Sequence, residues 1–247
     1  EDLIAAARVG SPLAIGLADD GTYLGSDAIA LAPFSDQLIY LEEGDWALLS
    51  RAGVRIFDEA GREVDRPVTP TPSSVSLAEK GNYRHFMAKE IHEQPAVLGH
   101  TFGHYLDLSS ETVRIAEAAS IDFAGAGRIS ISACGTAYYA GLVGRYWFER
   151  LARMPVDIDI ASEFRYREIP LSPNDLAVFI SQSGETADTL ASLRYTRAAG
   201  QQIASVVNVP TSSIARESDV ALPTLAGPEI GVASTKAFTC QLAVLAS

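Results

Sequence analysis

Three hydroxyl side chains and a glycine stand directly after an apolar run in the second half of the chain. The run DLAVFI, at residues 175–180, predicts a buried strand, and a helical pattern begins after Thr186. Ser181, Gln182 and Ser183 lie in the connection between them. Hydroxyls, backbone N–H groups and the positive end of a helix dipole can bind an anion without lysine or arginine. The spacing therefore predicts a cradle for a phosphate dianion; the alternative is that the hydroxyls only cap the helix.

A second connection has the same design. The segment ISISACGTAYYAG, at residues 129–141, reads as a strand, a turn at Cys134, Gly135 and Thr136, and a helix. Ligands bind outside the carboxyl ends of parallel strands, so two such turns in one sheet can converge on one ligand. Cys134 could be a nucleophile, but the spacing sets no histidine or aspartate beside it. A small buried turn residue is the alternative reading of this cysteine.

A third loop, EIGVASTKAFT at residues 229–239, joins a loop to a helix through Gly231 and Ser234. Lys236 would stand in the first turn of that helix, where the dipole does not favour a cation. This mild conflict indicates that the loop does more than connect two elements.

Other chemical templates do not fit. The glycines Gly125 and Gly127 precede their strand, whereas a dinucleotide fingerprint follows one. The four histidines, all within residues 85–104, lack zinc-ligand spacing. We therefore predict no metal site, no cofactor and no catalytic residue within this chain.

Composition narrows the function classes. The chain has 247 residues, with 19 Lys plus Arg against 31 Asp plus Glu, for a net charge of −12. Such a balance argues against nucleic acid and anionic membranes as partners. Two cysteines rule out a disulfide scaffold and favour the reducing cytoplasm. Neither of the two long uncharged stretches is apolar enough for the ~20 residues that span a bilayer.

The elements that would position these loops fall into three regions. Residues 1–66 read as short strands separated by turns, with no sign of a first strand, and residues 67–80 read as a linker rich in proline and serine. Residues 81–247 read as α/β, because strands and helices alternate from residue 128 onward. Before that, residues 83–120 read as helical, with Pro95 ending or kinking the first helix.

Three further helices are predicted from the same patterns. A capping box at Ser109 or Ser110 predicts a helix over 109–120. The segment 137–152 is apolar nearly all round, which predicts a buried helix. A last helix is expected from residue 231 onward.

Several motifs together resemble a known family. They are CGTAYYAG (134–141), ASEFRYR (161–167), SQSGETADTL (181–190), NVPTSSIARESDVAL (208–222) and EIGVASTKAFTCQL (229–242). This set is similar to the first sugar-isomerase (SIS) subdomain of the glucosamine-6-phosphate synthase family, the glutamine–fructose-6-phosphate amidotransferases. Segments within residues 11–64 resemble the last third of the glutaminase domain in that family.

The resemblance implies a fold and a set of contacts. The fold would be a flavodoxin-like SIS subdomain with five parallel strands, preceded by a β-rich remnant of an Ntn-type glutaminase domain. The phosphate of fructose 6-phosphate would lie on Ser181, Gln182, Ser183, Thr186 and Thr136. The residues that would line the sugar are Cys134, Gly135, Val232 and Ser234. Ala137 stands where many members carry serine, so one phosphate contact is missing or comes from the backbone.

The resemblance also implies a reaction. The family makes glucosamine 6-phosphate from fructose 6-phosphate and glutamine, and glucose 6-phosphate is a further expected ligand. The glutaminase cysteine and the distal isomerase residues have no counterpart here, so we expect a phosphate half-site that is inactive alone, with glutamine used only by the full-length enzyme. Exposed apolar faces predict a homodimer or larger oligomer. The alternatives are a non-catalytic SIS-type phosphosugar-binding module and, less favoured, a nucleotide-binding domain.

Overall fold

The computed structural model describes residues 3–10, 12–26, 28–51, 53–71, 80–107, 109–123 and 125–247. The chain divides into two compact units, Glu1–Glu79 and Lys80–Ser247. Most of the predicted linker, residues 72–79, lies outside the described residues. Its first part is a strand, because Val68–Pro70 pairs with a neighbouring strand. In the described part of the chain, no helix combines the length and the apolar character that crossing a membrane requires.

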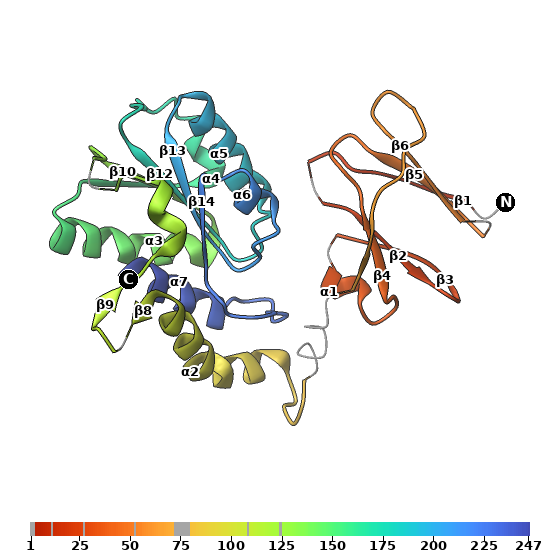
Figure 1. Cartoon of the computed structure of the whole chain (residues 1–247), viewed down its shortest axis with the longest axis horizontal. Coiled ribbons are helices and arrows are strands. Elements are labelled where there is room, and N and C mark those ends of the chain that lie inside the picture. Colours follow the sequence, from red (N-terminus) through yellow and green to blue (C-terminus); the bar gives the residue numbers. More distant parts are fainter. Residues whose placement is uncertain are drawn as a thin grey trace. The chain divides into compact units, whose positions relative to one another are not determined.

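The first unit holds two antiparallel sheets (Figure 1). One has the order β1 (Leu3–Ala7), β5 (Trp46–Ser50), β6 (Gly53–Phe57), and the other β3 (Gly21–Gly25), β2 (Ala14–Ala18), β4 (Gln37–Tyr40), β7 (Val68–Pro70), with helix α1 (Ala28–Leu31). Ile15 and Ile39 of one sheet share a core with Leu49 and Ile56 of the other. The sequence showed no sign of β1, yet this strand pairs with β5 along its whole length.

The second unit is built on one parallel sheet with the order β11-β10-β12-β13-β14. The strands are β10 (Ile129–Ala133), β11 (Val156–Ile160), β12 (Leu176–Ser181), β13 (Gln202–Val207) and β14 (Val220–Pro223). Numbered by chain position, the order is 2-1-3-4-5, which is the flavodoxin-like arrangement. The predicted α/β class with five parallel strands is confirmed.

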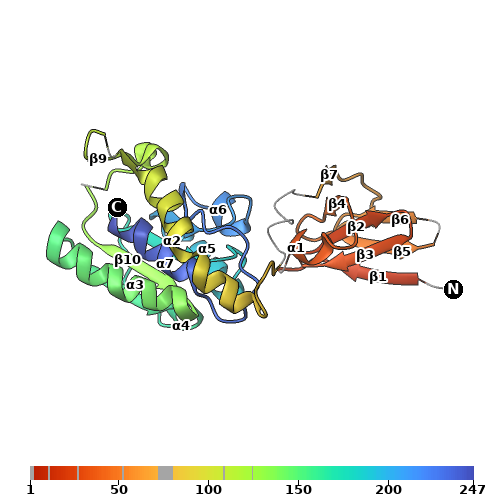
Figure 2. The same cartoon turned by 90° about the horizontal axis from the view of Figure 1, so that it is seen from below.

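Helices cover both faces of this sheet (Figure 2). They are α2 (Phe86–Tyr105), α3 (Gly135–Trp147), α4 (Ala161–Phe164), α5 (Ala187–Ala198), α6 (Ser213–Arg216) and α7 (Lys236–Ala246), with the short helices η2 (Ala116–Ser120) and η3 (Phe148–Ala152). Val178 and Ile180 of β12 face the core that includes residues of α3 and α7. Phe179, between them, faces the core that includes residues of α5 and α6. Both faces of the central strand β12 are therefore dry, which explains its continuous apolar run.

The prediction that Pro95 ends or kinks its helix is wrong in one respect, because α2 runs through Pro95 to Tyr105. Proline has no N–H to donate to the carbonyl of Ile91 one turn earlier. The side-chain amide of Gln94 donates to that carbonyl at 3.2 Å instead. A neighbouring side chain thus supplies the hydrogen bond that proline removes.

The helix predicted over residues 109–120 is also wrong. A two-stranded hairpin of β8 (Leu106–Asp107) and β9 (Thr112–Val113) occupies the first part, followed by η2. Asp107 accepts the hydroxyl of Ser109 at 2.6 Å and the amides of Ser109 and Ser110, and these bonds lower its carboxyl pKa to about 2. The two serines therefore complete a turn closed by an aspartate and do not begin a helix.

Two further helices differ from expectation. The helix predicted over 137–152 is not buried all round, because Tyr139 and Tyr146 are 60% and 70% exposed. The buried face of α3 is made of small residues, Ala137, Ala140, Gly141 and Gly144. At Gly141 a side chain would clash with Ile158. The last helix begins at Lys236 and not at residue 231, so the segment before it is a loop.

Candidate functional site

The cysteine turn, at residues 134–136, and the hydroxyl turn, at residues 181–186, follow two neighbouring strands. Strands β10 and β12 are neighbours, with Ala133 paired to Ile180; β10 ends at Ala133 and β12 one residue after Ile180, at Ser181. The chain order of the sheet reverses at β10, which has β11 on one side and β12 on the other. Crevices form at such switch points, because successive connections leave toward opposite faces of the sheet. The two turns therefore follow neighbouring strands at the same edge of the sheet.

The buried side chain of Ser181 holds the hydroxyl turn in shape. It is the last residue of β12, its side chain is buried, and its Oγ accepts the amide of Gly184 at 3.0 Å. The same Oγ lies 3.0 Å from Oγ1 of Thr186. Thr186 is the residue before α5, yet its side chain does not cap the helix. The capping alternative therefore fails for this threonine.

The rim of the turn keeps hydrogen-bond donors. Ser183 Oγ accepts the amide of Glu185 at 3.1 Å, so its own proton remains available to a ligand. Gln182 and Ser183 are half-buried, at the margin between protein and solvent. The carboxylate of Glu185 is held by α6, because one of its oxygens accepts the amide of Ser213 at 2.7 Å; its other oxygen is buried and has no hydrogen-bond partner among the described residues.

Gly184 is required at its position. Its φ is +67°, a left-handed conformation that glycine adopts without strain, and a Cβ there would overlap the side chain of Ser212. Its carbonyl accepts the amide of Ile214 at 3.0 Å. The hydroxyl turn is thus packed against the start of α6 and held in one shape.

Two helix N-termini face the same edge of the sheet. Cys134 is the residue before α3 and Thr186 the residue before α5, and neither caps its helix with its side chain. The first amides of both helices therefore lack a side-chain acceptor from these residues. Gly135, with φ of +58°, and Thr136 open α3 and are exposed, so Thr136 lies in the helix and not in the preceding turn. Two helix N-termini at one edge of the sheet favour a bound anion there.

The third predicted segment follows β14 at the same edge. Val232 is fully exposed, and Ser234 Oγ donates to Glu229 at 2.9 Å. The side chain of Asn208 joins this segment to the others: its amide nitrogen donates to Gly227 and its oxygen accepts the amide of Ala226, both at 2.8 Å.

Asn208 also reaches the hydroxyl turn, because its backbone amide donates to the carbonyl of Gln182 at 3.2 Å. The residue-by-residue prediction did not include it. A signal was available, since Asn208 directly follows β13 and so stands at the carboxyl edge of the sheet.

Lys236 stands in the first turn of a helix, where the dipole disfavours a cation, because an acidic side chain of α2 pairs with it. Lys236 is buried in the first turn of α7, and its Nζ lies 2.8 Å from Oε2 of Glu93 in α2.

Among the described residues, no group of His, Cys, Asp and Glu side chains is arranged to hold a metal ion. Two of the histidines have protein partners, His104 on Glu117 and His92 on the carbonyl of Ala88.

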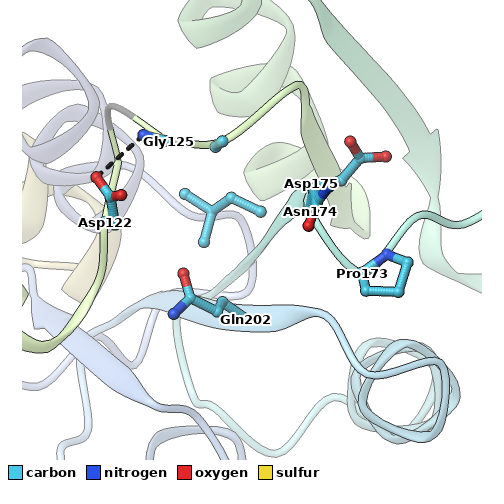
Figure 3. Close-up of a pocket in the computed structure, with 8 residues that line it drawn as sticks. Asp122, Gly125, Pro173, Asn174, Asp175 and Gln202 are labelled. Carbon is cyan, nitrogen blue, oxygen red and sulfur yellow. Dashed lines mark hydrogen bonds between the residues drawn. The ribbon is translucent and has the colours of Figure 1, made fainter.

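A hollow of about 290 Å³ lies at the opposite, amino-terminal edge of the sheet (Figure 3). It lies between the segment before β10 and the starts of β12 and β13, where Asp122, Asn174 and Gln202 surround it. Asp122 accepts the amide of Gly125 at 3.0 Å. The carboxylates of Asp122 and Asp175 at this hollow would repel a phosphate, so it is a poorer candidate than the hydroxyl turn.

Comparison with curated proteins gives relatives along the whole chain. The sequence is 65% identical over 247 residues to isomerizing glutamine–fructose-6-phosphate aminotransferase of Mesorhizobium japonicum, and 63% identical over 246 residues to that of Bradyrhizobium diazoefficiens. These matches cover 100% of this chain and 40% of each relative. The chain therefore spans well under half the length of the relatives that it matches.

Solved structures agree on the fold. The C-terminal domain of glucosamine-fructose-6-phosphate aminotransferase from Francisella tularensis superposes with a TM-score of 0.63 at 47% identity, covering 68% of this chain and 47% of that one. Glucosamine-6-phosphate deaminase from Thermotoga maritima, at 24% identity and a TM-score of 0.53, covers 65% of this chain and 47% of that one, and it shares the fold alone. The SIS domain family matches residues 122–247, which hold the sheet and both turns. This chain belongs to the SIS domain family.

Proposed function

We propose that the hydroxyl turn binds the phosphate of a hexose 6-phosphate. Ser181, Gln182, Ser183 and Thr186 would form the cradle, and Thr136 at the start of α3 would complete it. The observation that supports the proposal is that the Ser181 and Thr186 hydroxyls lie 3.0 Å apart directly before α5, whose N-terminus lies at the same edge of the sheet as that of α3. Binding by such groups needs no basic side chain.

We further propose that the sugar lies between the first turn and the third loop. Cys134 and Gly135 would contact it from one side, and Val232 and Ser234 from the other. Fructose 6-phosphate, glucosamine 6-phosphate and glucose 6-phosphate are the ligands that we expect. Relatives at 61–65% identity along the chain, all bearing the isomerizing aminotransferase name, support these choices.

The reaction proposed for the whole protein is the glutamine-dependent conversion of fructose 6-phosphate to glucosamine 6-phosphate. This chain would supply the sugar-phosphate half-site, while the glutaminase nucleophile and the distal isomerase groups would come from elsewhere in the full-length enzyme. In this proposal residues 1–66 are the end of a glutaminase domain and residues 81–247 the first SIS subdomain. The match of the relatives across both units supports this reading over a non-catalytic sensor.

We also propose that the chain forms a homodimer or larger oligomer. Strand β1 is at the edge of its sheet, and Leu3 and Ile4 on it are 55% and 56% exposed. Exposed apolar edge strands are prone to pair with another chain.

The cradle is tested by calorimetric titration of fructose 6-phosphate into the chain. The double variant Ser183→Ala with Thr186→Ala removes two hydroxyl contacts to a charged group, each worth about 1.5–3 kcal/mol, so affinity should fall by about 100-fold or more. The matched control is Ser110→Ala with Thr112→Ala, an exposed pair in the β8–β9 hairpin, which should leave affinity unchanged. Equal affinities for the cradle variant and the unaltered chain would refute the proposal.

A further inference from the structure

The loop between β14 and α7 is held by a helix from far away in the chain. Glu90, in α2, is 2% exposed, and its Oε1 accepts the amides of Ile230 at 2.6 Å and Gly231 at 2.9 Å. Its second oxygen lies 3.2 Å from the same Gly231 amide. A buried carboxylate that accepts two backbone amides fixes the path of the chain at both residues.

The Glu90 carboxylate lies so close to residue 231 that only glycine fits there. A Cβ on Gly231 would overlap the carboxylate of Glu90 and lie 3.2 Å from Cε of Met87. Glycine at this position is therefore explained by the close approach of α2, since its backbone is not in the left-handed region. The contact leaves no room for a water molecule between the carboxylate and the loop.

Further contacts hold the end of the loop, where α7 begins. Glu229 accepts the amides of Thr235 at 2.8 Å and Ala237 at 3.1 Å, so it caps α7. Lys236, on the first turn of α7, is paired with Glu93 of α2. Between these anchors, Val232 and Ala233 project into solvent.

Hydrogen bonds of Asn208 connect the loop to the phosphate cradle. It leaves the carboxyl edge of the sheet, where the amide of Thr224 donates to Val207 at 3.0 Å. Asn208 then connects its first turn to Gln182 of the cradle. Displacing residues 230–231 would therefore move the exposed tip at Val232 relative to a cradle held by separate hydrogen bonds.

We propose that Glu90 is a positioning residue that holds Val232 and Ser234 where they contact the sugar part of the ligand. The inference rests on the proposed function, because it assumes that a sugar phosphate occupies the cradle. Glu90 does not touch the ligand in this proposal; it acts through the backbone of Ile230 and Gly231. Losing it should weaken contacts to the sugar and leave contacts to the phosphate intact.

The test compares two ligands on one variant of the chain. Glu90→Gln replaces one of the two acceptor oxygens with a donor, and calorimetry measures its affinity for fructose 6-phosphate and for inorganic phosphate. We expect the fructose 6-phosphate affinity to fall by about tenfold or more, with inorganic phosphate affinity within about twofold. The control Glu149→Gln, which makes the same change where Glu149 pairs with Arg145, should alter neither affinity.

A second pair of variants isolates the contact itself. Gly231→Ala keeps the charge of Glu90 but pushes the loop away, and it should show the same selective loss. Glu90→Asp with Gly231→Ala makes room for the added methyl group, so it should recover part of the fructose 6-phosphate affinity of Gly231→Ala. If Glu90→Gln does not fold, these two variants carry the same comparison.

The outcomes separate the inference from the proposed function. Equal losses for both ligands, or no loss for either, would overturn the positioning role of Glu90 while leaving the cradle assignment intact. Failure of the unaltered chain to bind either ligand would instead refute the cradle, and the inference with it.

Discussion

The side-chain oxygens of Ser181 and Thr186 lie 3.0 Å apart across the turn between β12 and α5. Ser181 also accepts the amide of Gly184, so one buried hydroxyl holds the turn in shape. Thr186 can point its proton or its lone pairs toward a ligand without disturbing the bond between Ser181 and Gly184. The turn is therefore organised before any ligand binds, which reduces the entropic cost of binding.

Ser181→Ala should destabilise the second unit. The change leaves the Gly184 amide without its acceptor in a buried place, which costs about 1–3 kcal/mol of unfolding free energy. Urea denaturation followed by circular dichroism measures the loss. Ser110→Ala on the exposed hairpin is the control, and its effect should stay within about 0.5 kcal/mol. Equal stability of the two variants would contradict the organising role of Ser181.

Gly184→Ala and Gly200→Ala separate backbone strain from steric overlap. Both glycines have positive φ, +67° and +81°, but a Cβ on Gly200 meets nothing within 4 Å. Gly200→Ala should therefore show strain alone, about 1–2 kcal/mol. Gly184→Ala should cost about 1–3 kcal/mol more, because Ser212 must move. A smaller loss at Gly184 than at Gly200 in denaturation would show that the turn is not packed against Ser212.

The two cysteines should react at different rates. Cys240 is buried, and burial raises the pKa of its thiol, whereas Cys134 is partly exposed. Iodoacetamide should label Cys134 at least about tenfold faster, because Cys240 reacts only when the unit opens. Mass spectrometry of timed samples gives both rates.

Fructose 6-phosphate should slow the labelling of Cys134 and leave that of Cys240 unchanged, if the sugar lies against the first turn. Protection of neither thiol at saturating ligand would place the sugar elsewhere.

The stability of the first unit should depend on the ionisation of Asp45. Hydrogen bonds from the Arg66 guanidinium, at 2.8 and 2.9 Å, lower the carboxyl pKa of Asp45. A depressed folded-state pKa stabilises the protein above the unfolded value of about 4, and this contribution is lost as pH falls through the folded-state pKa. Asp45→Asn should therefore cost about 1.5–3 kcal/mol near neutral pH and less near pH 3.

Trp46, stacked on Phe57 at 4.2 Å, reports unfolding of this unit by fluorescence. A Trp147→Phe background removes the only other tryptophan of the chain. A cost of Asp45→Asn that does not change with pH would show that the charge on Asp45 contributes nothing.

Self-association should depend on strand β1. A lysine in place of Ile4 puts a charge on the exposed edge strand, which disfavours pairing with another chain. Sedimentation analysis should show a concentration-dependent mass for the unaltered chain and a smaller one for Ile4→Lys. Val9→Lys adds the same charge at an exposed residue outside the strand and should have no effect. A monomer at all concentrations would contradict the proposed oligomer.

The sheet of the second unit could be predicted because its signals are local. Strands β10, β12 and β13 are largely apolar runs of five or six residues that are almost entirely buried, so the run itself marks the strand. The hydroxyl turn was predictable for a similar reason, since its residues are neighbours in the chain and follow a strand end. Which side chains would touch in that turn, such as Ser181 with Gly184, was not readable from the spacing.

The predictions at Pro95 and at residues 109–120 were wrong because a neighbouring side chain made hydrogen bonds that the local sequence pattern did not indicate. Pro95 is tolerated because Gln94 donates to the carbonyl that proline leaves unpaired. Ser109 and Ser110 bond to Asp107, so they form a turn where a capping box was expected. In each case hydrogen bonds made by one neighbouring side chain outweighed the average preference of the residue type.

The sequence alone determined the α/β class, the strands and the two turns that meet at one edge, because these depend on short-range patterns of apolar and small residues. Only the tertiary structure decided what holds the third loop. Glu90 and Gly231 are separated by 141 positions, and their contact depends on how α2 packs against α7. Packing of that kind is the sum of many weak contacts across the whole unit, and no short stretch of residues encodes it.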